Sequence, residues 1–308
     1  MKSNSETNAA PYAALIGVQI FFGSLPVVAK PILQIVPALS MVGFRVGITA
    51  AVLAAVQIVR GRFFLKFNSD YAKLALLSLF GVTFNQILFI SGLARTKAAN
   101  TSLLAATIPI FTLAVASVLG FERLRLLKLA GIILAALGVL VIIDPRSASF
   151  SSETTLGDLL VVGNSLSYGI YVATSKSVVT RNGAIRSVMW IFIFASIVCV
   201  PLGGYILSSA PLEGATTATW LAVLYIALGG TTAPYLLNAW ALARVNPSTV
   251  AIFVYLQPVI GFLLAVFFLG ENIGPSFIVA ALLIFAGVFL VTRRFTTADT
   301  HVSVPPAV

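Results

Sequence analysis

The sequence predicts an all-α integral membrane protein whose ten transmembrane helices form two inverted-topology repeats of five helices each. Three observations support this fold class. The chain is 59% hydrophobic and only 9% charged, whereas a soluble domain carries roughly 25% charged residues. Apolar stretches of about 20 residues, the length that crosses a bilayer, recur along nearly the whole chain. Finally, the second half of the chain repeats the first.

The first predicted repeat covers residues 12–143, after a polar cytoplasmic tail at 1–11. Its apolar stretches lie at 12–30, 38–59, 71–94, 99–120 and 126–143. No convincing cleavage site follows the first stretch, so we expect a retained helix rather than a signal peptide. In the fifth stretch, Gly131, Ala135 and Gly138 form a small-residue stripe. Such a stripe is typical of a tight helix contact, here either within the monomer or across a dimer.

The second predicted repeat covers residues 156–292. Its apolar stretches lie at 156–176, 187–208, 218–241, 248–269 and 275–292. We expect residues 144–155 to form an external linker and residues 293–308 a second cytoplasmic tail. Because Pro and Gly interrupt several stretches, the predicted boundaries hold only to within a few residues.

Rare and polar residues recur at a separation of 149 positions. The matched pairs are Gly81 with Gly230, Thr83 with Thr232, Arg95 with Arg244, Pro109 with Pro258, Glu122 with Glu271 and Gly138 with Gly287. Apolar matches are common by chance in such a sequence, but the chain has only five Glu residues in all. The pattern therefore indicates an internal duplication.

Five helices per repeat is an odd number, so the second repeat should enter the membrane upside down relative to the first. Inverted repeats of this kind are typical of secondary transporters, whose substrate site lies near the bilayer midplane between the halves. Each half could then adopt the conformation of the other, which would give two states of similar energy that open to opposite sides. The alternative interpretation is that the duplication only reflects how a large helical bundle was assembled.

The net charge of +10 reports membrane orientation rather than nucleic-acid binding. With the N-terminus inside, 14 of the 19 basic residues fall in cytoplasmic segments, and the others are Lys30, Arg45, Arg95, Lys97 and Arg146. This asymmetry follows the positive-inside rule and predicts a multi-pass protein of the inner (plasma) membrane with both termini in the cytoplasm. The expected partners are the lipid bilayer and a small-molecule substrate. We expect no nucleic acid, and either a monomer or a homodimer.

Cys199 is the only cysteine and His301 the only histidine. This excludes a disulfide within the chain and metal sites built on clusters of these residues. The sequence shows neither paired intramembrane acids nor a nucleophile motif. We therefore expect no metal, no cofactor and no enzymatic activity.

Short motifs in both halves resemble the EamA-type domain of the drug/metabolite transporter superfamily. The first half contributes "GLART", "ATIPIF", "LGFERL" and "LGVLVI", and the second contributes "ALARV", "LQPVIG", "LGENI" and "AGVFLV". The first half departs from the second where Phe121 separates Gly120 from Glu122. The resemblance covers residues 12–292 and implies two five-helix domains with a transport function. Amino-acid and metabolite exporters are the most similar branch by overall pattern.

Polar side chains in the third and eighth predicted helices are the first candidates for a substrate site. Polar groups within membrane spans are costly, so they usually face a cavity or another helix. Residues three apart share a helix face, as Thr83 and Gln86 do in one helix. Thr232, Tyr235 and Asn238 do so in the other. We therefore predict that both helices line a central cavity at the same depth, the alternative being hydrogen bonding between helices.

Five further polar side chains extend the predicted cavity. They are Gln19 in the first helix, Tyr168 and Tyr171 in the sixth, and Tyr255 and Gln257 in the ninth. Together with them, the amide of Gln86 and the phenol of Tyr235 would suit a polar or zwitterionic solute. For the first and sixth helices, the alternative is tight packing around glycine.

Three residues are predicted to act in gating. Pro109 and Pro258 can kink equivalent helices and so form hinges, although a static bend is the alternative. Arg45, about eight residues into the second span, is predicted to have a structural or gating role. Its alternatives are attraction of a substrate carboxylate and snorkelling to the outer surface. Glu122 and Glu271 are expected to be structural, at the starts of helices.

These features predict a carrier that exports small polar or amphiphilic metabolites, foremost neutral or aromatic amino acids, by alternating access. A proton relay needs ionisable groups within the membrane, and none is placed at the midplane, so we expect transport without proton coupling. The alternatives are a multidrug or nucleobase-type metabolite exporter and a non-transporting membrane scaffold. A multidrug exporter of hydrophobic cations would need a buried carboxylate, and none is evident.

Overall fold

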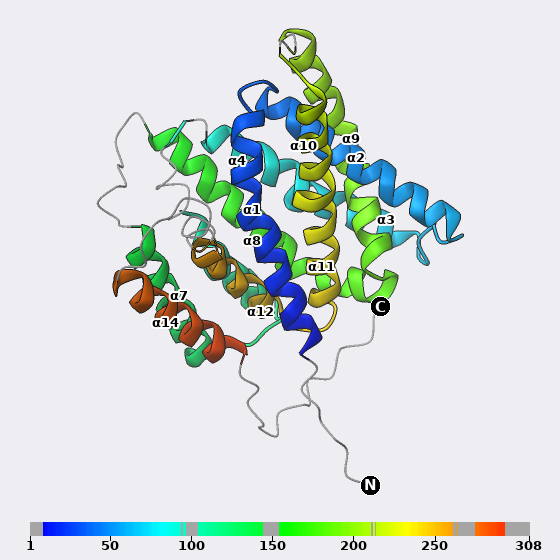
Figure 1. Cartoon of the computed structure of the whole chain (residues 1–308). Helices are drawn as coiled ribbons and strands as arrows, with labels where there is room; N and C mark the ends of the chain where they lie inside the picture. The colour runs from blue at the N-terminus through cyan, green and yellow to red at the C-terminus, as the bar shows by residue number, and fades with distance from the viewer. Residues whose placement is uncertain are drawn as a thin grey trace.

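The described part of the protein is entirely helical. A computed structural model describes residues 9–93, 95–96, 104–143, 154–210, 212, 214–260, 263 and 275–292, and no β-strand occurs among them. Figure 1 shows the helices packed against one another in a bundle. The predicted all-α class is therefore confirmed for these residues.

The first half of the bundle consists of α-helices and one π turn. In the described residues these are α1 (Ala10–Ile32), α2 (Ala38–Val59), α3 (Ser69–Ser78), η1 (Leu79–Thr83), α4 (Phe84–Leu93), α6 (Ile108–Val118) and α7 (Leu126–Ile143). The elements α3, η1 and α4 follow one another without a break. They form one helix that contains a π turn in its middle.

The second half has the same succession of elements. In the described residues these are α8 (Thr155–Asn182), α9 (Ala184–Ser208), α10 (Thr217–Ala227), η3 (Leu228–Thr232), α11 (Ala233–Leu242), α12 (Pro247–Ile252), η4 (Phe253–Tyr255) and α14 (Pro275–Thr292). Here α10, η3 and α11 are continuous, and η3 is again a π turn.

Apolar helices long enough to cross a membrane occur in both halves. Within the described residues five reach that length: Ala38–Val59, Ser69–Gly92, Thr155–Asn182, Ala184–Ser208 and Thr217–Leu242. Five shorter apolar helices also occur there: Ala10–Leu25, Ile108–Val118, Leu126–Val141, Pro247–Ile260 and Phe277–Thr292. Each overlaps one predicted stretch. The stretches at 99–120 and 248–269, and the linker at 144–155, lie partly or mostly outside the described residues.

The predicted end of the sixth helix at residue 176 is too early. Helix α8 continues to Asn182 and ends where Gly183 adopts a left-handed φ of 83°, a conformation that glycine reaches at no steric cost. Helix α9 then begins at once, at Ala184. Hydropathy marks where apolar side chains stop, whereas the helix continues through polar residues until the backbone meets glycine.

Helix contacts between the halves come in matching pairs. Helix α2 packs on α9, and α7 packs on α14, so helices of the same rank in the two predicted repeats touch each other. Helix α4 packs on α8, and its counterpart α11 packs on α1, which Figure 1 shows lying beside it. In these last two contacts, the third helix of one half packs on the first helix of the other half.

The small-residue stripe on α7 packs within the monomer. A Cβ on Gly131 would lie 2.9 Å from the carbonyl oxygen of Gly287 on α14, and a Cβ on Gly287 would lie 2.7 Å from Cβ of Ala135. Only glycine allows the two backbones to approach this closely. Figure 1 shows α7 and α14 side by side at one edge of the bundle.

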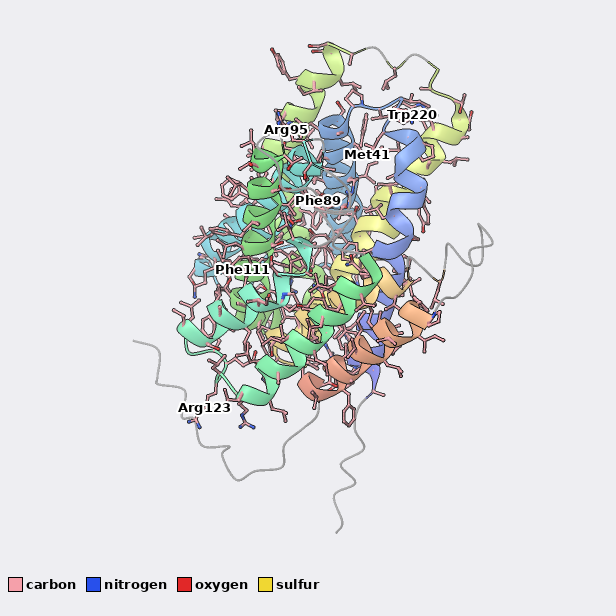
Figure 2. The ribbon with its side chains drawn as sticks, turned by 90° about the vertical axis from the view of Figure 1, so that its left-hand side faces the viewer. Met41, Phe89, Arg95, Phe111, Arg123 and Trp220 are labelled. Carbon is pink, nitrogen blue, oxygen red and sulfur yellow. The ribbon has the colours of Figure 1, made fainter. Side chains whose placement is uncertain are left out.

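Basic residues that the charge rule assigns to opposite membrane sides lie at opposite ends of the bundle. Figure 2 shows Arg95 toward the end that also holds Trp220 and Met41, whereas Arg123 lies at the other end. The side chains of Arg95 and Arg123 are both exposed.

Candidate functional site

Two π turns lie at equivalent places in the two halves and organise the polar interior. The turns η1 (79–83) and η3 (228–232) are five residues long, and their positions differ by the repeat distance of 149 residues. A π turn inserts one residue into an α-helix and is frequent at functional sites. In η3, the hydroxyls of Thr231 and Thr232 each donate to the carbonyl five residues earlier, at 2.9 Å.

Arg45 on α2 reaches across to the π turn of the other half. Its side chain is buried, with the whole residue 7% exposed, and so does not snorkel to the surface. Its Nε donates to the hydroxyl of Thr231 at 2.8 Å. Its Nη1 and Nη2 donate, each at 3.4 Å, to Oε1 of Gln86 and to the carbonyl oxygen of Gly230. Every one of these acceptors is neutral.

Tyr235 on α11 makes the corresponding contact in the opposite direction. Its hydroxyl donates at 2.9 Å to the carbonyl oxygen of Gly81 in η1. Gly81 and Gly230 are equivalent residues, so the same carbonyl of each π turn accepts a bond from the opposite half. The Tyr235 ring packs edge-on against Phe192, with centroids 4.9 Å apart. Gln86, the counterpart of Tyr235, is also a neighbour of its side chain.

The two equivalent threonines differ in their partners. Thr232 pairs with Thr49 of α2, with hydroxyl oxygens 2.9 Å apart. Thr83 is equally buried, but its hydroxyl makes no hydrogen bond within the described residues and lies near the thiol of Cys199.

Three further contacts connect five of the remaining predicted residues. Asn238 donates to the Tyr168 hydroxyl at 2.9 Å, and Tyr168 packs on Tyr171 with centroids 5.9 Å apart. Gln257 donates to Oε1 of Gln19 at 2.9 Å, across the halves.

Tyr255 makes a contact between equivalent positions. Its hydroxyl donates at 2.7 Å to the carbonyl oxygen of Ala106, and the two residues are separated by 149 positions.

The two predicted hinge prolines follow irregular turns rather than bending an uninterrupted helix. Pro109 is the second residue of α6, after a turn at residues 106–107. Pro258 comes shortly after the 3₁₀ segment η4. In both helices the regular hydrogen bonding is therefore already broken before the proline.

One ion pair, Asp70 with Arg181, and one capping contact, Glu122 with Ser248, join the halves. Asp70 accepts bonds from Arg181 and from Asn182, the latter at 2.7 Å. Glu122 accepts from Lys128 and from the backbone N–H of Ser248 at 3.2 Å. Glu122 was expected at the start of its own following helix. Its carboxylate instead accepts from a backbone N–H in the first turn of α12, in the other half. Glu271 lies outside the described residues.

An apolar groove of about 280 Å³ lies between α2 and α9, away from these contacts. It is lined by Ser40, Gly43, Phe44, Gly47, Ile48, Val200, Gly203, Gly204 and Leu207. None of the predicted site residues lines it. Most of those residues are instead buried in the interior, whereas Tyr168, Gln257 and Pro258 are half-buried. Most of them bond to one another or to backbone carbonyls.

Sequence reasoning missed several members of this polar interior. Thr231 bonds to Arg45, and Thr49 bonds to Thr232. The carbonyl groups of Gly81 and Gly230 accept hydrogen bonds from the opposite half. The adjacent threonines at 231 and 232 were a usable signal for Thr231. Pro234 has no N–H to offer the carbonyl four residues earlier, so it was a usable signal for the free carbonyl of Gly230, whereas no residue pattern marks the carbonyl of Gly81 or the π turns themselves.

The long apolar helices are those of a multi-pass helical membrane protein, and the family match assigns that protein to the transporters. Two stretches of the chain, residues 10–144 and 155–293, match the model of the EamA-like transporter family. The chain therefore belongs to the EamA-like transporter family. The resemblance inferred from the short motifs is confirmed.

Several relatives are named as transporters. A protein of Archaeoglobus fulgidus named an uncharacterized transporter is 28% identical and aligns over 74% of this chain and 78% of its own length. A probable terminal-alkyne amino-acid exporter of Streptantibioticus cattleyicolor is 26% identical over 77% and 78%, respectively. A probable amino-acid metabolite efflux pump of Salmonella typhimurium is 29% identical over 62% and 66%.

A solved crystal structure shares the fold. It superposes with a TM-score of 0.78 over 92% of this chain and 96% of its own, at 18% sequence identity. At that identity the likeness concerns the fold alone.

Proposed function

We propose that the protein is a secondary transporter that exports small polar or amphiphilic metabolites, foremost neutral or aromatic amino acids. Export proceeds by alternating access between two inverted five-helix repeats in the inner (plasma) membrane. Both termini lie in the cytoplasm, as the distribution of basic residues predicts. The transported molecule binds in the interior between the halves, among the predicted residues described above.

The reciprocal contact of the two π turns carries this proposal. Arg45 of the first half bonds to Gly230 of the second, and Tyr235 of the second half bonds to Gly81 of the first. Polar groups of both halves thus meet at equivalent carbonyls. Transporters built from inverted repeats bind substrate at such an interface, where interrupted helices present backbone groups. Rocking of one half against the other would break these bonds and open the interior.

Two considerations favour amino acids over hydrophobic cations. Two relatives carry names that refer to amino-acid export. A site for hydrophobic cations would need a free buried carboxylate. The acidic residues within the described ranges are Asp70, Glu122 and Asp158, and each one accepts hydrogen bonds from other side chains.

Flux measurements in proteoliposomes test the proposal. Purified protein should accelerate the movement of labelled leucine or phenylalanine across the bilayer. Gln86→Ala and Tyr235→Phe should each slow it about tenfold, because a buried hydrogen bond contributes on that scale. Tyr205→Phe is the matched control, since Tyr205 is 72% exposed, and it should leave flux unchanged. Wild-type vesicles that carry no amino acid faster than empty vesicles would overturn the proposal.

A further inference from the structure

The positive charge of Arg45 is buried without a negative partner in the described part of the chain. An ionised side chain within a membrane protein is costly and is usually paired. The Arg45 acceptors are a hydroxyl, an amide oxygen and a backbone carbonyl. Hydroxyl and carbonyl dipoles solvate the guanidinium, but they leave its net charge uncompensated.

Carboxylates of the described residues are engaged elsewhere. Asp70 pairs with Arg181, and Glu122 pairs with Lys128. Asp158 accepts from Thr96 at 2.5 Å. A counter-charge for Arg45 is therefore not supplied by these side chains.

Arg45 also has more N–H groups than the hydrogen bonds it makes to its neighbours. A guanidinium has five N–H donors, and three serve the bonds described, one on each nitrogen. Two of these bonds measure 3.4 Å, beyond the usual 2.7–3.2 Å range. One N–H remains on each terminal nitrogen, which is the arrangement that binds the two oxygens of a carboxylate.

We propose that Arg45 binds the carboxylate group of the transported molecule, so that the substrate class is amino acids and related monocarboxylates. This inference rests on the proposed function and specifies its site. Two of the Arg45 acceptors, Thr231 and Gly230, belong to the second half. When the halves separate, Arg45 exchanges these neutral acceptors for the substrate carboxylate. When they close without substrate, the acceptors take the place of the carboxylate.

The surroundings of Arg45 accommodate the rest of an amino acid. The carbonyl oxygens of Gly81 and Gly230 each have a second lone pair that can accept from an α-ammonium group. The rings of Phe192 and Tyr235, perpendicular at 4.9 Å, provide an apolar wall for an aliphatic or aromatic side chain.

The test compares an amino acid with its amide, which lacks only the negative charge. In wild-type proteoliposomes, leucinamide and phenylalaninamide should compete with labelled leucine and phenylalanine at least about tenfold more weakly than the unlabelled acids do, because charge-assisted bonds are roughly twice as strong as neutral ones. In Arg45→Gln, KM for the acids should rise about 10- to 100-fold, and the preference for acid over amide should fall to near one. Arg45→Lys should keep part of that preference. The control Arg244→Gln removes an exposed arginine that stacks on Trp240, and it should behave as wild type.

A second variant keeps the test decisive if Arg45→Gln fails to fold. Gln86→Glu would place a carboxylate beside the Arg45 guanidinium, so that an internal partner competes with the substrate while the cation stays. It should also raise KM and reduce the preference for acid over amide. Wild-type transport without that preference, or an unchanged preference in folded Arg45→Gln or Gln86→Glu protein, would overturn the role of Arg45 and leave the export function standing. Absence of any amino-acid flux in wild type would instead overturn the proposed function itself.

Discussion

At the scale of single residues, burial decides which member of an ion pair matters more. The carboxylate of Asp70 is fully buried, whereas the side chain of its partner Arg181 is 38% exposed. Asn182 donates a further bond to Asp70. Loss of the arginine therefore leaves a buried anion with one remaining donor, but loss of the carboxylate leaves a cation that water can still reach.

We predict that Arg181→Gln destabilises the protein more than Asp70→Asn does. The first change should cost about 1–3 kcal/mol, the range for leaving a buried charged group under-bonded. The second should cost less than about 1 kcal/mol, in line with partly exposed ion pairs. Unfolding midpoints in mixed detergent micelles measure both. Equal losses, or the opposite order, would contradict this explanation of the pair.

At the residue scale, the sequence predicted which polar side chains are buried, because the residue type and its apolar surroundings were enough to identify them. Gln19, Thr83, Gln86, Tyr235 and Asn238 were all selected because polar side chains are rare in apolar helices, and all are buried. Their partners were not predictable, because most bonds run between the halves or to backbone carbonyls. The burial of Arg45 was not predictable either, since it depends on packing against an element almost 200 positions away in sequence.

At the scale of elements, the contact between α7 and α14 depends on the absence of side chains. Gly131 and Gly287 meet backbone to backbone. By contrast, a Cβ on Gly204 of α9 would meet nothing within 4 Å. These positions therefore respond in opposite ways to an added methyl group.

We predict that Gly131→Ala destabilises the protein by about 1–3 kcal/mol, the usual cost of overpacking. Gly204→Ala is the matched control and should be neutral or stabilising by up to about 1 kcal/mol, because alanine is the better helix former. Unfolding midpoints of both variants under identical detergent conditions provide the measurement. A stable Gly131→Ala protein would show that α7 and α14 can move apart freely.

Helices were predictable as elements, but their internal irregularities were not. Apolar runs near 20 residues located every described helix, because hydropathy reports the membrane directly. The π turns at Leu79–Thr83 and Leu228–Thr232 have sequences that an ordinary α-helix would also accept. A local hydropathy pattern does not distinguish the two forms.

At the scale of the whole molecule, the proposed inversion of the two halves predicts on which side of the membrane equivalent residues lie. Arg95 and Arg244 are counterparts in the duplication, and both are exposed. If the halves are inverted, these two positions lie on opposite sides of the membrane, although their local sequences are alike.

We predict that Arg95→Cys and Arg244→Cys react with a membrane-impermeant maleimide from opposite faces. The substitutions are made separately in a Cys199→Ser background, which removes the single native thiol. In oriented membranes, Arg244→Cys should be labelled from the cytoplasmic face and Arg95→Cys only from the other face. Labelling of both from one face would rule out inverted repeats.

The bond from Tyr255 to Ala106 joins two counterparts of the duplication. If the two halves exchange conformations, as proposed, the equivalent bond would run from the side chain of Ala106 to the carbonyl of Tyr255. Alanine has no hydroxyl to return, and the partner state therefore lacks this bond. One hydrogen bond contributes a free-energy difference of about 1 kcal/mol between the two states, which corresponds to a roughly fivefold ratio of their populations. Under the proposed alternating access, the carrier without substrate should then mostly adopt the arrangement described here, and the Tyr255 hydroxyl would favour the side of the membrane to which that arrangement opens.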